Sequence, residues 1–568
     1  MTIRRSDTRL TDDRIRRYEA EGYWCVPTFP ELLQRNAREC PHKVGYSDER
    51  GSITWGELWR RSMRLAGHLL DLGVRPGDVV GIQLPNRIEF VVALGAVNAV
   101  GAIACPQATA LRSAEVERIL GFSNAVLNIV ARTDKTGFDY LAMLAKLKGS
   151  LADLQRVIVV DTDEADLPPW ALSYESLMTR DSAGSELEKR LASAAPGVHD
   201  VNRVLFTSGS TGDPKAVLHT YASSIFSNYQ INEHLRVGPD SVLLLFIPIT
   251  LNWGLFQVIQ TAVAQCRLIL QQEFVAERLL RTVAKEQVTH LGGPPTAIVA
   301  ILNSLAAEHP NLSSLQCYVT SGSSCPISLL RQVRREIGCS IIEGYGMTES
   351  GWIAATGQED DPEATVGSVG RPFPGMEIRL LERDADADVP PGEPGEIAMR
   401  GPSVCVGYYR NEELNRAVWT ADDWFRSGDL GYLDPAGRLR IVGRSKDLIK
   451  HGGSSIFPRE IEELLLVHPK VADVAVVGFA DSYFGENVCA CVVVRPGQQF
   501  NLAEVIAFLR DKVARYKLPQ RLEFFERLPY TPTGKVQKHL IRVELDRRAE
   551  HGPDAPVVAD LPKAQEAK

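Results

Sequence analysis

The chain has 568 residues and a mass of 62.6 kDa. This is larger than a domain built around a single hydrophobic core, so we expect at least two domains. Its formal net charge of −8 and its pI near 5.9 give it no basic footprint, which argues against nucleic acid as a partner. The start of the chain lacks the apolar core of a secretory signal, and the ten scattered cysteines show no zinc spacing, which predicts a cytoplasmic protein with free thiols.

Helices and short strands alternate along the first 160 residues, which is the pattern of a layered α/β domain. The longest apolar run, residues 90–105, is shorter than the roughly 18–20 residues that span a bilayer, so we predict a buried helix and no transmembrane segment. The expected elements are helices at 29–38, 55–72, 90–100 and 114–120, and strands at 44–47, 79–84 and 157–160.

The middle of the chain continues this alternation, and several of its strands end in glycine and hydroxyl residues. Open α/β sheets place ligands at such strand ends, so these ends are expected to share one crevice. The expected elements are strands at 243–249, 268–270, 288–291, 317–320 and 341–342, a helix at 277–286, and a helix or linker at 181–196.

The sequence changes character after about residue 366, where Pro, Gly and short alternating segments predict a small β subdomain at 366–444. The charged connector 443–447 is the predicted boundary between a large N-terminal domain, 1–444, and a small α+β C-terminal domain, 445–550. The tail, 551–568, is predicted to be disordered. In the C-terminal domain we expect helices at 458–468 and 502–515 and strands at 471–478 and 488–494, the second strand placing Cys489 and Cys491 on one face.

Residues 205–217 combine hydroxyls, glycines and a lysine between apolar flanks, which predicts a phosphate-binding loop. The hydroxyls donate hydrogen bonds, the glycines let backbone N–H groups turn toward an anion, and the lysine adds a charge. The spacing is not that of a Walker A loop, and a Ser/Gly-rich surface turn is the alternative when this stretch is taken alone. The predicted contacts are Thr207, Ser208, Gly209, Ser210, Thr211, Gly212 and Lys215.

Three further motifs follow at separate places in the chain. Residues 343–350 read Glu-Gly-Tyr-Gly-Met-Thr-Glu-Ser, in which two glycines let a ring lie against a flat base and a hydroxyl beside a carboxylate suits a phosphate with its Mg²⁺. Residues 424–429 end in Asp429, which is suited to accept hydrogen bonds from ribose hydroxyls. Residues 532–535, Pro-Thr-Gly-Lys, present one lysine near the C-terminus. Each motif taken alone also fits an ordinary turn.

In this order and at these separations, the four motifs resemble the adenylate-forming superfamily, which includes acyl-CoA synthetases, peptide-synthetase adenylation domains and beetle luciferases. The resemblance covers roughly residues 55–541. It implies a large N-terminal domain, a small mobile C-terminal domain and a two-step reaction at their interface. A carboxylic acid reacts with ATP to give acyl-AMP and pyrophosphate, and a thiol then takes the acyl group, so ATP, Mg²⁺ and coenzyme A are implied.

The resemblance also implies a role for each matching residue. The loop from Thr207 to Lys215 would hold the β- and γ-phosphates. The remaining nucleotide contacts implied are Ser323 and Ser324 at the adenine, Tyr345 on the base within the motif that begins Glu343-Gly344, Thr348 on the α-phosphate, Glu349 on Mg²⁺, and Asp429 and Arg444 on the ribose.

Two lysines and a glycine match residues in the segments that move between the two reaction steps in members of the family. Lys535 matches the lysine that bridges the acyl carboxylate and the α-phosphate, where like charges meet and cationic stabilisation is needed. Lys446 falls at the family's hinge position, a role that replaces its plain interpretation as a solvated linker charge. Gly453 matches the glycine that lines the thiol tunnel.

The acid pocket implied by the resemblance contains Asn252, Trp253, Gly322 and Gly346. Asn252 matches the asparagine that hydroxybenzoate-activating relatives place on the ortho hydroxyl of the acid, and an asparagine that caps a turn is an equal alternative. Trp253 would form a wall of a flat pocket. Leu251 stands where a histidine is common in the family, which puts histidine gating in doubt.

We therefore predict an AMP-forming ligase that makes an acyl-CoA from an aromatic, alicyclic or medium-chain acid. One alternative is an aryl-acid AMP ligase that loads a phosphopantetheinyl carrier protein. From another class, a nucleotide-binding protein without activity is the third hypothesis. The sequence does not specify the acid, and it leaves a homodimer open.

Overall fold

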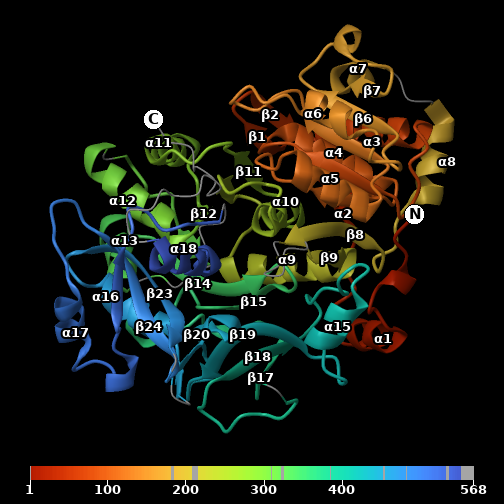
Figure 1. Cartoon of the computed structure of the whole chain (residues 1–568). Coiled ribbons are helices and arrows are strands. Elements are labelled where there is room, and N and C mark those ends of the chain that lie inside the picture. Colours follow the sequence, from red (N-terminus) through yellow and green to blue (C-terminus); the bar gives the residue numbers. More distant parts are fainter. Residues whose placement is uncertain are drawn as a thin grey trace.

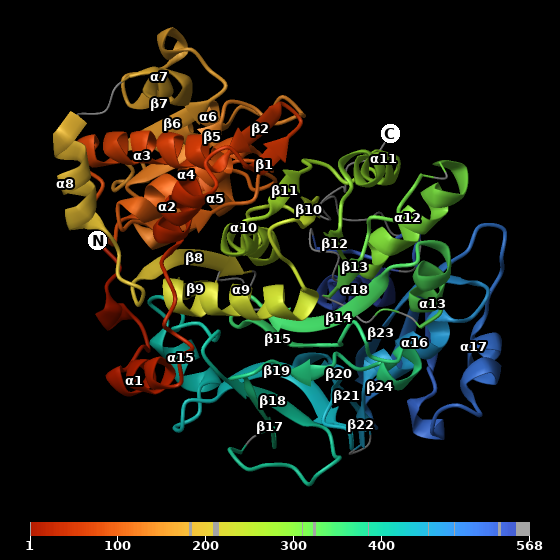
Figure 2. The same ribbon diagram turned by 180° about the vertical axis from the view of Figure 1, so that it is seen from behind.

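The computed structural model describes residues 2–180, 184–207, 215–308, 310–321, 325, 327–383, 385–451, 454–481, 483–531 and 536–551. These residues form four sheets with helices packed against them, arranged as Figures 1 and 2 show from opposite sides. The mixed α/β architecture confirms the predicted fold class. No helix among the described residues is both long and apolar enough to cross a membrane.

The first sheet orders seven described strands as β7-β6-β5-β3-β4-β8-β9, parallel except for the hairpin of β8 and β9 at one edge. In that hairpin Thr207 pairs with Lys215, so the strands bring the two ends of the predicted phosphate loop together. The strands are β3 (Val79–Gln83), β4 (Ile103–Pro106), β5 (Leu127–Ala131), β6 (Arg156–Val160), β7 (Ala171–Ser173), β8 (Val201–Thr207) and β9 (Lys215–Thr220). The helices of this part are α1 (Asp12–Ala20), α2 (Phe29–Glu39), α3 (Trp55–Asp71), α4 (Ile88–Ala99), α5 (Ser113–Ser123), α6 (Tyr140–Leu147), α7 (Tyr174–Thr179) and α8 (Gly184–Ala194), with 3₁₀ turns η1 (Arg5–Asp7) and η2 (Glu164–Asp166).

The second sheet orders nine described strands as β16-β15-β14-β13-β12-β10-β11-β1-β2. Its central strands are parallel, so their carboxyl ends share one edge. The strands are β1 (Val44–Asp48), β2 (Gly51–Thr54), β10 (Val242–Leu245), β11 (Arg267–Leu270), β12 (His290–Gly292), β13 (Cys317–Thr320), β14 (Ser340–Met347), β15 (Gly351–Ala355) and β16 (Arg371–Pro372). The helices are α9 (Tyr221–Leu235), α10 (Asn252–Ala264), α11 (Ala276–Glu286), α12 (Pro295–Glu308), α13 (Ile327–Glu336) and α14 (Pro362–Thr365).

Two smaller sheets follow. One is antiparallel and consists of β17 (Glu377–Leu381), β18 (Gly395–Arg400), β19 (Phe425–Leu433) and β20 (Leu439–Arg444), with α15 (Glu412–Val418) beside it. The other consists of β21 (Ile449–His451), β22 (Ser454–Ile456), β23 (Val471–Asp481), β24 (Gly485–Val494) and β25 (Arg521–Phe524). Its helices and turns are α16 (Pro458–Leu466), α17 (Leu502–Leu509), α18 (Lys538–His551), η3 (Ser445–Asp447) and η4 (Arg515–Lys517).

The buried apolar side chains divide at the start of the last sheet. One cluster runs from Ile3 to Leu439 and joins the first three sheets, with α9 packed between β9 and β15 (Figure 2). Residues after Ile449 form two further clusters, one on each face of the five-stranded sheet. Cys489 and Cys491 lie together in one of them, with their sulfurs 3.8 Å apart, as predicted from their spacing.

Two predicted elements in the first half of the chain differ from the structure. The apolar run 90–105 is not one helix, because α4 ends at Ala99 and Gly101, with φ of +67°, turns the chain into β4. The strand predicted at 243–249 ends at Leu245. Pro248, which has no N–H to donate, lies in the irregular segment that follows.

Two more predicted elements differ in length. The strand predicted at 341–342 extends through Met347, because β15 pairs with its second half. The helix predicted at 502–515 ends at Leu509. The carbonyl of Leu509 accepts hydrogen bonds from the N–H groups of Lys512 and Val513, which turns the chain out of the helix.

Candidate functional site

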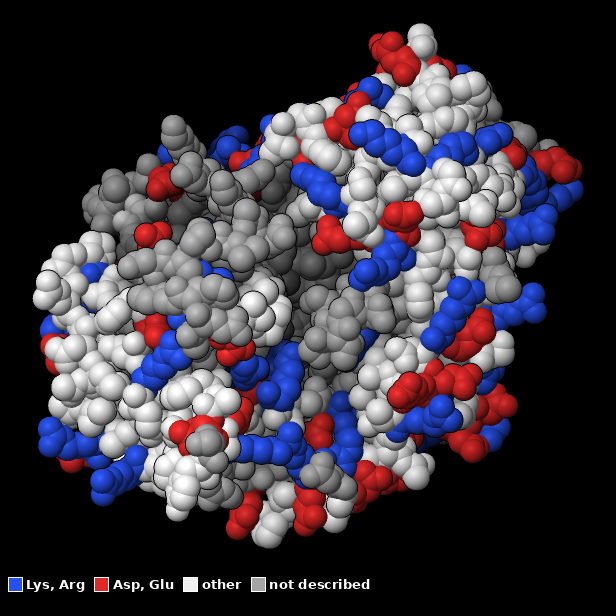
Figure 3. Space-filling model, viewed as in Figure 1, with Lys and Arg blue, Asp and Glu red and all other residues white. Residues whose placement is uncertain are grey.

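A cleft of about 530 Å³ opens where β9, the end of β14 and the small antiparallel sheet meet. On this side the molecule is hollowed near its centre, and Lys and Arg side chains gather below the hollow (Figure 3). The cleft itself is lined by both signs of charge, the basic side chains of Lys215, Arg383 and Arg426 and the acidic side chains of Glu349, Asp386 and Glu396. Lining residues include Lys215, Met347, Glu349, Glu396, Tyr408, Arg426, Ser427 and Gly428.

Glu349 is held in this cleft by Tyr408. The Tyr408 hydroxyl donates a hydrogen bond of 2.7 Å to Oε1 of Glu349, and Glu349 is only 6% exposed. Burial, followed by the charge of Glu349, holds the pKa of Tyr408 well above its usual range, so the hydroxyl stays a donor. Lys215 lies over the same ring, with Nζ 5.6 Å from its centre. One tyrosine therefore contacts both a carboxylate and an ammonium of the cleft lining.

A second cluster joins three strands at the other side of β14. The Tyr345 hydroxyl donates to Oδ2 of Asp429 at 2.7 Å, and Nε of Arg444 donates to Oδ1 of the same carboxylate at 3.1 Å. Asp429 and Arg444 face each other across β19 and β20. The charge of Asp429 raises the pKa of Arg444 above its usual value. Both oxygens of the carboxylate are thus oriented before any ligand arrives.

The two glycines of the 343–350 motif are explained by their contact with β15. A Cβ at Gly344 would lie 1.9 Å from Cζ3 of Trp352, and a Cβ at Gly346 would lie 2.2 Å from the carbonyl oxygen of Gly351. Neither distance is possible between unbonded atoms. The close approach of β14 and β15 therefore requires glycine at both positions, and the predicted roles of Gly344 at the nucleotide and of Gly346 in the acid pocket stay predictions.

Glu343 lies inside this same strand and is almost fully buried. Its Oε1 accepts a hydrogen bond of 3.2 Å from the N–H of Cys325. Burial raises the pKa of Glu343 from 4.5 to about 7, since one hydrogen bond does not compensate for the lost water. A proton is therefore taken up or released here near neutral pH.

Thr348 and Lys446 are two further predicted site residues that the structure describes. The carbonyl of Thr348 accepts a hydrogen bond of 2.7 Å from Nε2 of His219, which fixes the tautomer of that buried histidine. Lys446 lies in η3, where burial and the charges of Arg444 and Lys215 lower its pKa. The predicted hinge lysine thus lies within the electrostatic reach of both cations of the site.

Two of the predicted acid-pocket residues lie at the start of α10, while Gly346 lies in β14. Asn252 is the first residue of that helix, and Trp253 meets Trp352 edge to face with ring centres 5.7 Å apart. A Cβ at Gly292 would lie 3.3 Å from Trp253, so this strand end also bounds the indole. The two indoles pack against each other here, and the predicted role of Trp253 as a wall of the acid pocket stays a prediction.

Several predicted site residues lie outside the described residues, so their predictions stay predictions. These are Ser208, Gly209, Ser210, Thr211, Gly212, Gly322, Ser323, Ser324, Gly453 and Lys535.

Sequence reasoning missed Tyr408, His219, Arg203 and Trp352. Each reaches the site through a contact with a residue far away in the chain, as when Tyr408 meets Glu349 across 59 positions. The aromatic pair Tyr408-Tyr409 was the only local signal for one of them.

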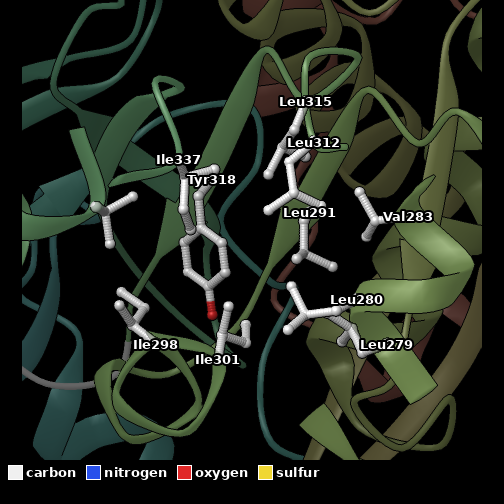
Figure 4. A pocket seen from close by; sticks show the side chains of 11 residues that line it. Leu279, Leu280, Val283, Leu291, Ile298, Ile301, Leu312, Leu315, Tyr318 and Ile337 are labelled. Carbon is white, nitrogen blue, oxygen red and sulfur yellow. The ribbon is translucent and has the colours of Figure 1, made fainter. Parts of the chain in front are cut away.

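A separate apolar cavity lies under α11 and α12, lined by leucines, isoleucines and valines, with Tyr318 reaching between Ile298 and Ile301 (Figure 4). Its volume is about 10 Å³, which holds at most one water molecule. Its walls offer no set of polar partners, so it is a packing defect of the core rather than a ligand site.

Known proteins match the chain over nearly its whole length. The family described as "AMP-binding enzyme" matches residues 33–409, and the one described as "AMP-binding enzyme C-terminal domain" matches residues 460–535. The chain is 31% identical over 554 residues to a medium-chain fatty-acid–CoA ligase of Escherichia coli (strain K12), with 96% of each chain covered.

Two further matches differ in the acid and in the reaction product that their names give. A 2,3-dihydroxybenzoate-AMP ligase of Bacillus subtilis (strain 168) is 30% identical over 541 residues, covering 94% of this chain and 97% of that one. The crystal structure of the anthranilate CoA ligase AuaEII in complex with anthranoyl-AMP has a TM-score of 0.81 and 25% identity, covering 93% of this chain and 99% of that chain.

Proposed function

The chain belongs to the AMP-binding enzyme family of adenylate-forming enzymes, and we propose that this member is an AMP-forming ligase joining an aromatic, alicyclic or medium-chain carboxylic acid to coenzyme A. The observation that carries the proposal is a cleft lined by Lys215 and the Glu349–Tyr408 pair, next to the Tyr345–Asp429–Arg444 cluster, since Gly428 lines the cleft and Asp429 follows it in β19. These groups come from separate elements and suit a phosphate chain, a metal and a ribose.

The reaction consists of two displacements. First, a carboxylate oxygen of the acid attacks the α-phosphorus of ATP, the bond to the bridging oxygen of the β-phosphate breaks, and pyrophosphate leaves. Then the sulfur of coenzyme A, having lost its proton, attacks the acyl carbon, and AMP leaves. Charge builds on phosphoryl oxygens in the first step, so positioned cations lower its barrier. Lys215 supplies one such cation, and Lys535 is proposed to supply the second.

Asp429 and Arg444 are proposed to orient the ribose, and Tyr345 to lie against the adenine. In the structure the Tyr345 hydroxyl and Arg444 both donate to Asp429, so the carboxylate is pre-oriented as a hydrogen-bond acceptor. Pre-orientation of this kind reduces the entropy lost on binding. Thr348, whose carbonyl is fixed by His219, is proposed to contact the α-phosphate.

Glu349 is suited to hold Mg²⁺. Magnesium is bound in nucleotide sites by one or two carboxylates together with phosphate oxygens and water, so the buried carboxylate of Glu349, which lines the cleft, fits it. No described Lys or Arg pairs with this carboxylate, and its one described side-chain hydrogen bond, from Tyr408, occupies only Oε1. The bound ion would offset phosphate charge.

Lys446 and residues 443–447 are proposed as the hinge and the boundary between residues 1–444 and 445–550. The small antiparallel sheet ends at Arg444, and the next strand, β21, already belongs to the sheet with its own core. Rotation of a few backbone angles in this connector would exchange Lys535 for the segment containing Gly453 between the two steps. This domain movement does not require a histidine at position 251, where the chain has Leu251.

A second candidate function is an aryl-acid AMP ligase that loads a phosphopantetheinyl carrier protein. Asn252 at the acid site and the similarity to the 2,3-dihydroxybenzoate-AMP ligase favour it. AMP release measured with free coenzyme A and with a holo-carrier protein separates the two functions, because only the true thiol acceptor accelerates it.

Acid-dependent exchange of pyrophosphate into ATP tests the shared first step. A panel of aromatic, alicyclic and medium-chain acids is expected to contain at least one that supports exchange in the presence of Mg²⁺. Absence of exchange with every acid would refute the proposal. We further propose a cytoplasmic location, which the ten free cysteines support, and sedimentation of the purified chain would decide whether it is a homodimer.

A further inference from the structure

A buried guanidinium lies next to the predicted acid site. Arg203 is in β8, four positions before Thr207, and is 4% exposed. Its Nη1 donates to Oγ of Ser224 on α9, and its Nη2 donates to Oδ1 of Asn252 on α10 at 3.4 Å. Its Nε is buried and has no acceptor among the described residues.

No described carboxylate neutralises this guanidinium. Arg87, which is equally buried, forms ion pairs with Asp161 at 2.6 Å and Glu89 at 3.3 Å, whereas Arg203 has two neutral oxygens. Burial lowers the pKa of Arg203 to about 9. Burying a cation without a counter-charge is costly, and proteins keep such groups where a ligand supplies the missing charge.

The groups that face Arg203 do not supply it. His219 is opposite Arg203 in the β8–β9 pair, and burial together with the charge of Arg203 holds the pKa of His219 well below its usual range. This histidine is therefore neutral, and it uses Nε2 to donate to Thr348. Ser223, Ser224 and Asn252 are also neutral, so the cluster carries one net positive charge.

The guanidinium also fixes the orientation of the Asn252 amide. A guanidinium has only hydrogen-bond donors. The Asn252 atom that faces it is therefore the acceptor Oδ1 and not the NH₂ group. The amide NH₂ is left for the opposite side of a half-buried residue that adjoins Trp253. Asn252 therefore offers donors, not acceptors, to a ligand beside the two indoles.

We propose that Arg203 is a positioning residue for the acid, which turns the amide donors of Asn252 toward it and lends them positive charge, so that the site favours an acid bearing a second, hydrogen-bond-accepting or anionic oxygen beside its carboxylate. This inference rests on the proposed function and names the feature that its substrate shares. An acid with a plain hydrocarbon body leaves the positive charge of the cluster without a partner.

The test uses the full-length protein and pyrophosphate exchange with two matched acids, benzoic acid and 2-hydroxybenzoic acid. In the wild type, 2-hydroxybenzoic acid is expected to have a kcat/KM at least about tenfold higher, with most of the difference in KM, as is typical for a charge-assisted hydrogen bond. Arg203→Met is expected to bring the ratio close to one, and Arg203→Lys, which keeps the charge, to restore part of it.

Two variants separate positioning from simple loss of structure. Ser224→Ala removes the other partner of Arg203 and leaves its contact with Asn252, so it is expected to keep the acid preference. Asn252→Asp places a carboxylate against the guanidinium and is expected to reverse the preference, because the acid's second oxygen then meets negative charge. This variant also carries the test if Arg203→Met fails to fold.

The outcomes are distinct. Two results would overturn the inference and leave the proposed function intact, provided that both acids support exchange. One is a kcat/KM ratio of the two acids that Arg203→Met leaves unchanged, and the other is a preference that Asn252→Asp does not reverse. A wild type that prefers benzoic acid would overturn it as well. Absence of exchange with any acid of the wider panel would overturn the proposed function itself.

Discussion

Glu343→Gln is expected to stabilise the protein at pH 8 and to have much less effect at pH 5. The pKa of Glu343 is about 7 in the folded chain, against the ordinary value of 4.5 that applies to the unfolded chain. Between pH 4.5 and pH 7 the folded chain therefore binds more protons than the unfolded chain. The stability contribution of the protonated form is fully present below pH 4.5 and is lost as the pH rises through about 7. The shift corresponds to about 3 kcal/mol, an upper value for a buried carboxyl.

Glutamine keeps the geometry while it removes the charge. Its side-chain oxygen still accepts from the N–H of Cys325, so the cost of a buried ionised carboxylate is the main change. Urea unfolding followed by tryptophan fluorescence at pH 5 and pH 8 measures the effect. The gain at pH 8 is expected to exceed that at pH 5 by about 2 to 3 kcal/mol.

The matched control is Glu413→Gln, which makes the same change on an exposed face of α15. It is expected to alter stability by less than about 0.5 kcal/mol at either pH. Equal gains for Glu343→Gln at both pH values, or a gain only at the lower one, would refute the reasoning, since neither pattern follows from a raised pKa.

Three other substitutions probe the cleft. Tyr408→Phe removes the donor to Glu349 and is expected to lower exchange activity about tenfold or more and to raise the Mg²⁺ concentration for half-maximal rate; an unchanged Mg²⁺ dependence would contradict the role of the pair. Lys535→Ala is expected to lower adenylation by a factor of about 10² to 10³ while sparing transfer from preformed acyl-AMP, and loss of both half-reactions would disprove that assignment. Gly344→Ala is expected to cost about 1 to 3 kcal/mol of stability, because its Cβ overlaps Trp352, whereas Gly149→Ala, with no atom within 4 Å, should be neutral in the same thermal-unfolding assay.

The sequence was sufficient for the layered fold because its signals are local. The alternation of helix and strand, and the apolar spacing of segments such as α3, are present within each window of the chain. The length of a strand was less predictable where it depends on pairing with another strand. Gly344 and Gly346 permit the close approach of β15, but the strand reaches Met347 only because β15 pairs with it, and that partner lies outside residues 340–347.

The candidate site divides in the same way. Asp429, Arg444 and Tyr345 were named from their motifs, and the structure brings these three together through two hydrogen bonds. Tyr408 and Arg203 were not named, because the sequence around a tyrosine or an arginine has no local pattern that distinguishes a structural from a functional side chain. Their meaning comes from what they meet in space, a carboxylate in one case and the absence of one among the described residues in the other.

The β8–β9 hairpin connects these observations. β8 carries Arg203 and ends at Thr207, while β9 begins at Lys215 and carries His219, which holds the carbonyl of Thr348. Arg203, which contacts Asn252, and Lys215, at the end of the predicted phosphate loop, therefore lie on the same two paired strands. Because the two strands of a hairpin move together, a shift of β8 caused by a change of charge beside Asn252 also shifts β9, which begins at Lys215. If the acid binds beside Asn252 and the phosphates bind beside Lys215, as proposed, the two reactants share one support, which is what an attack of one on the other requires.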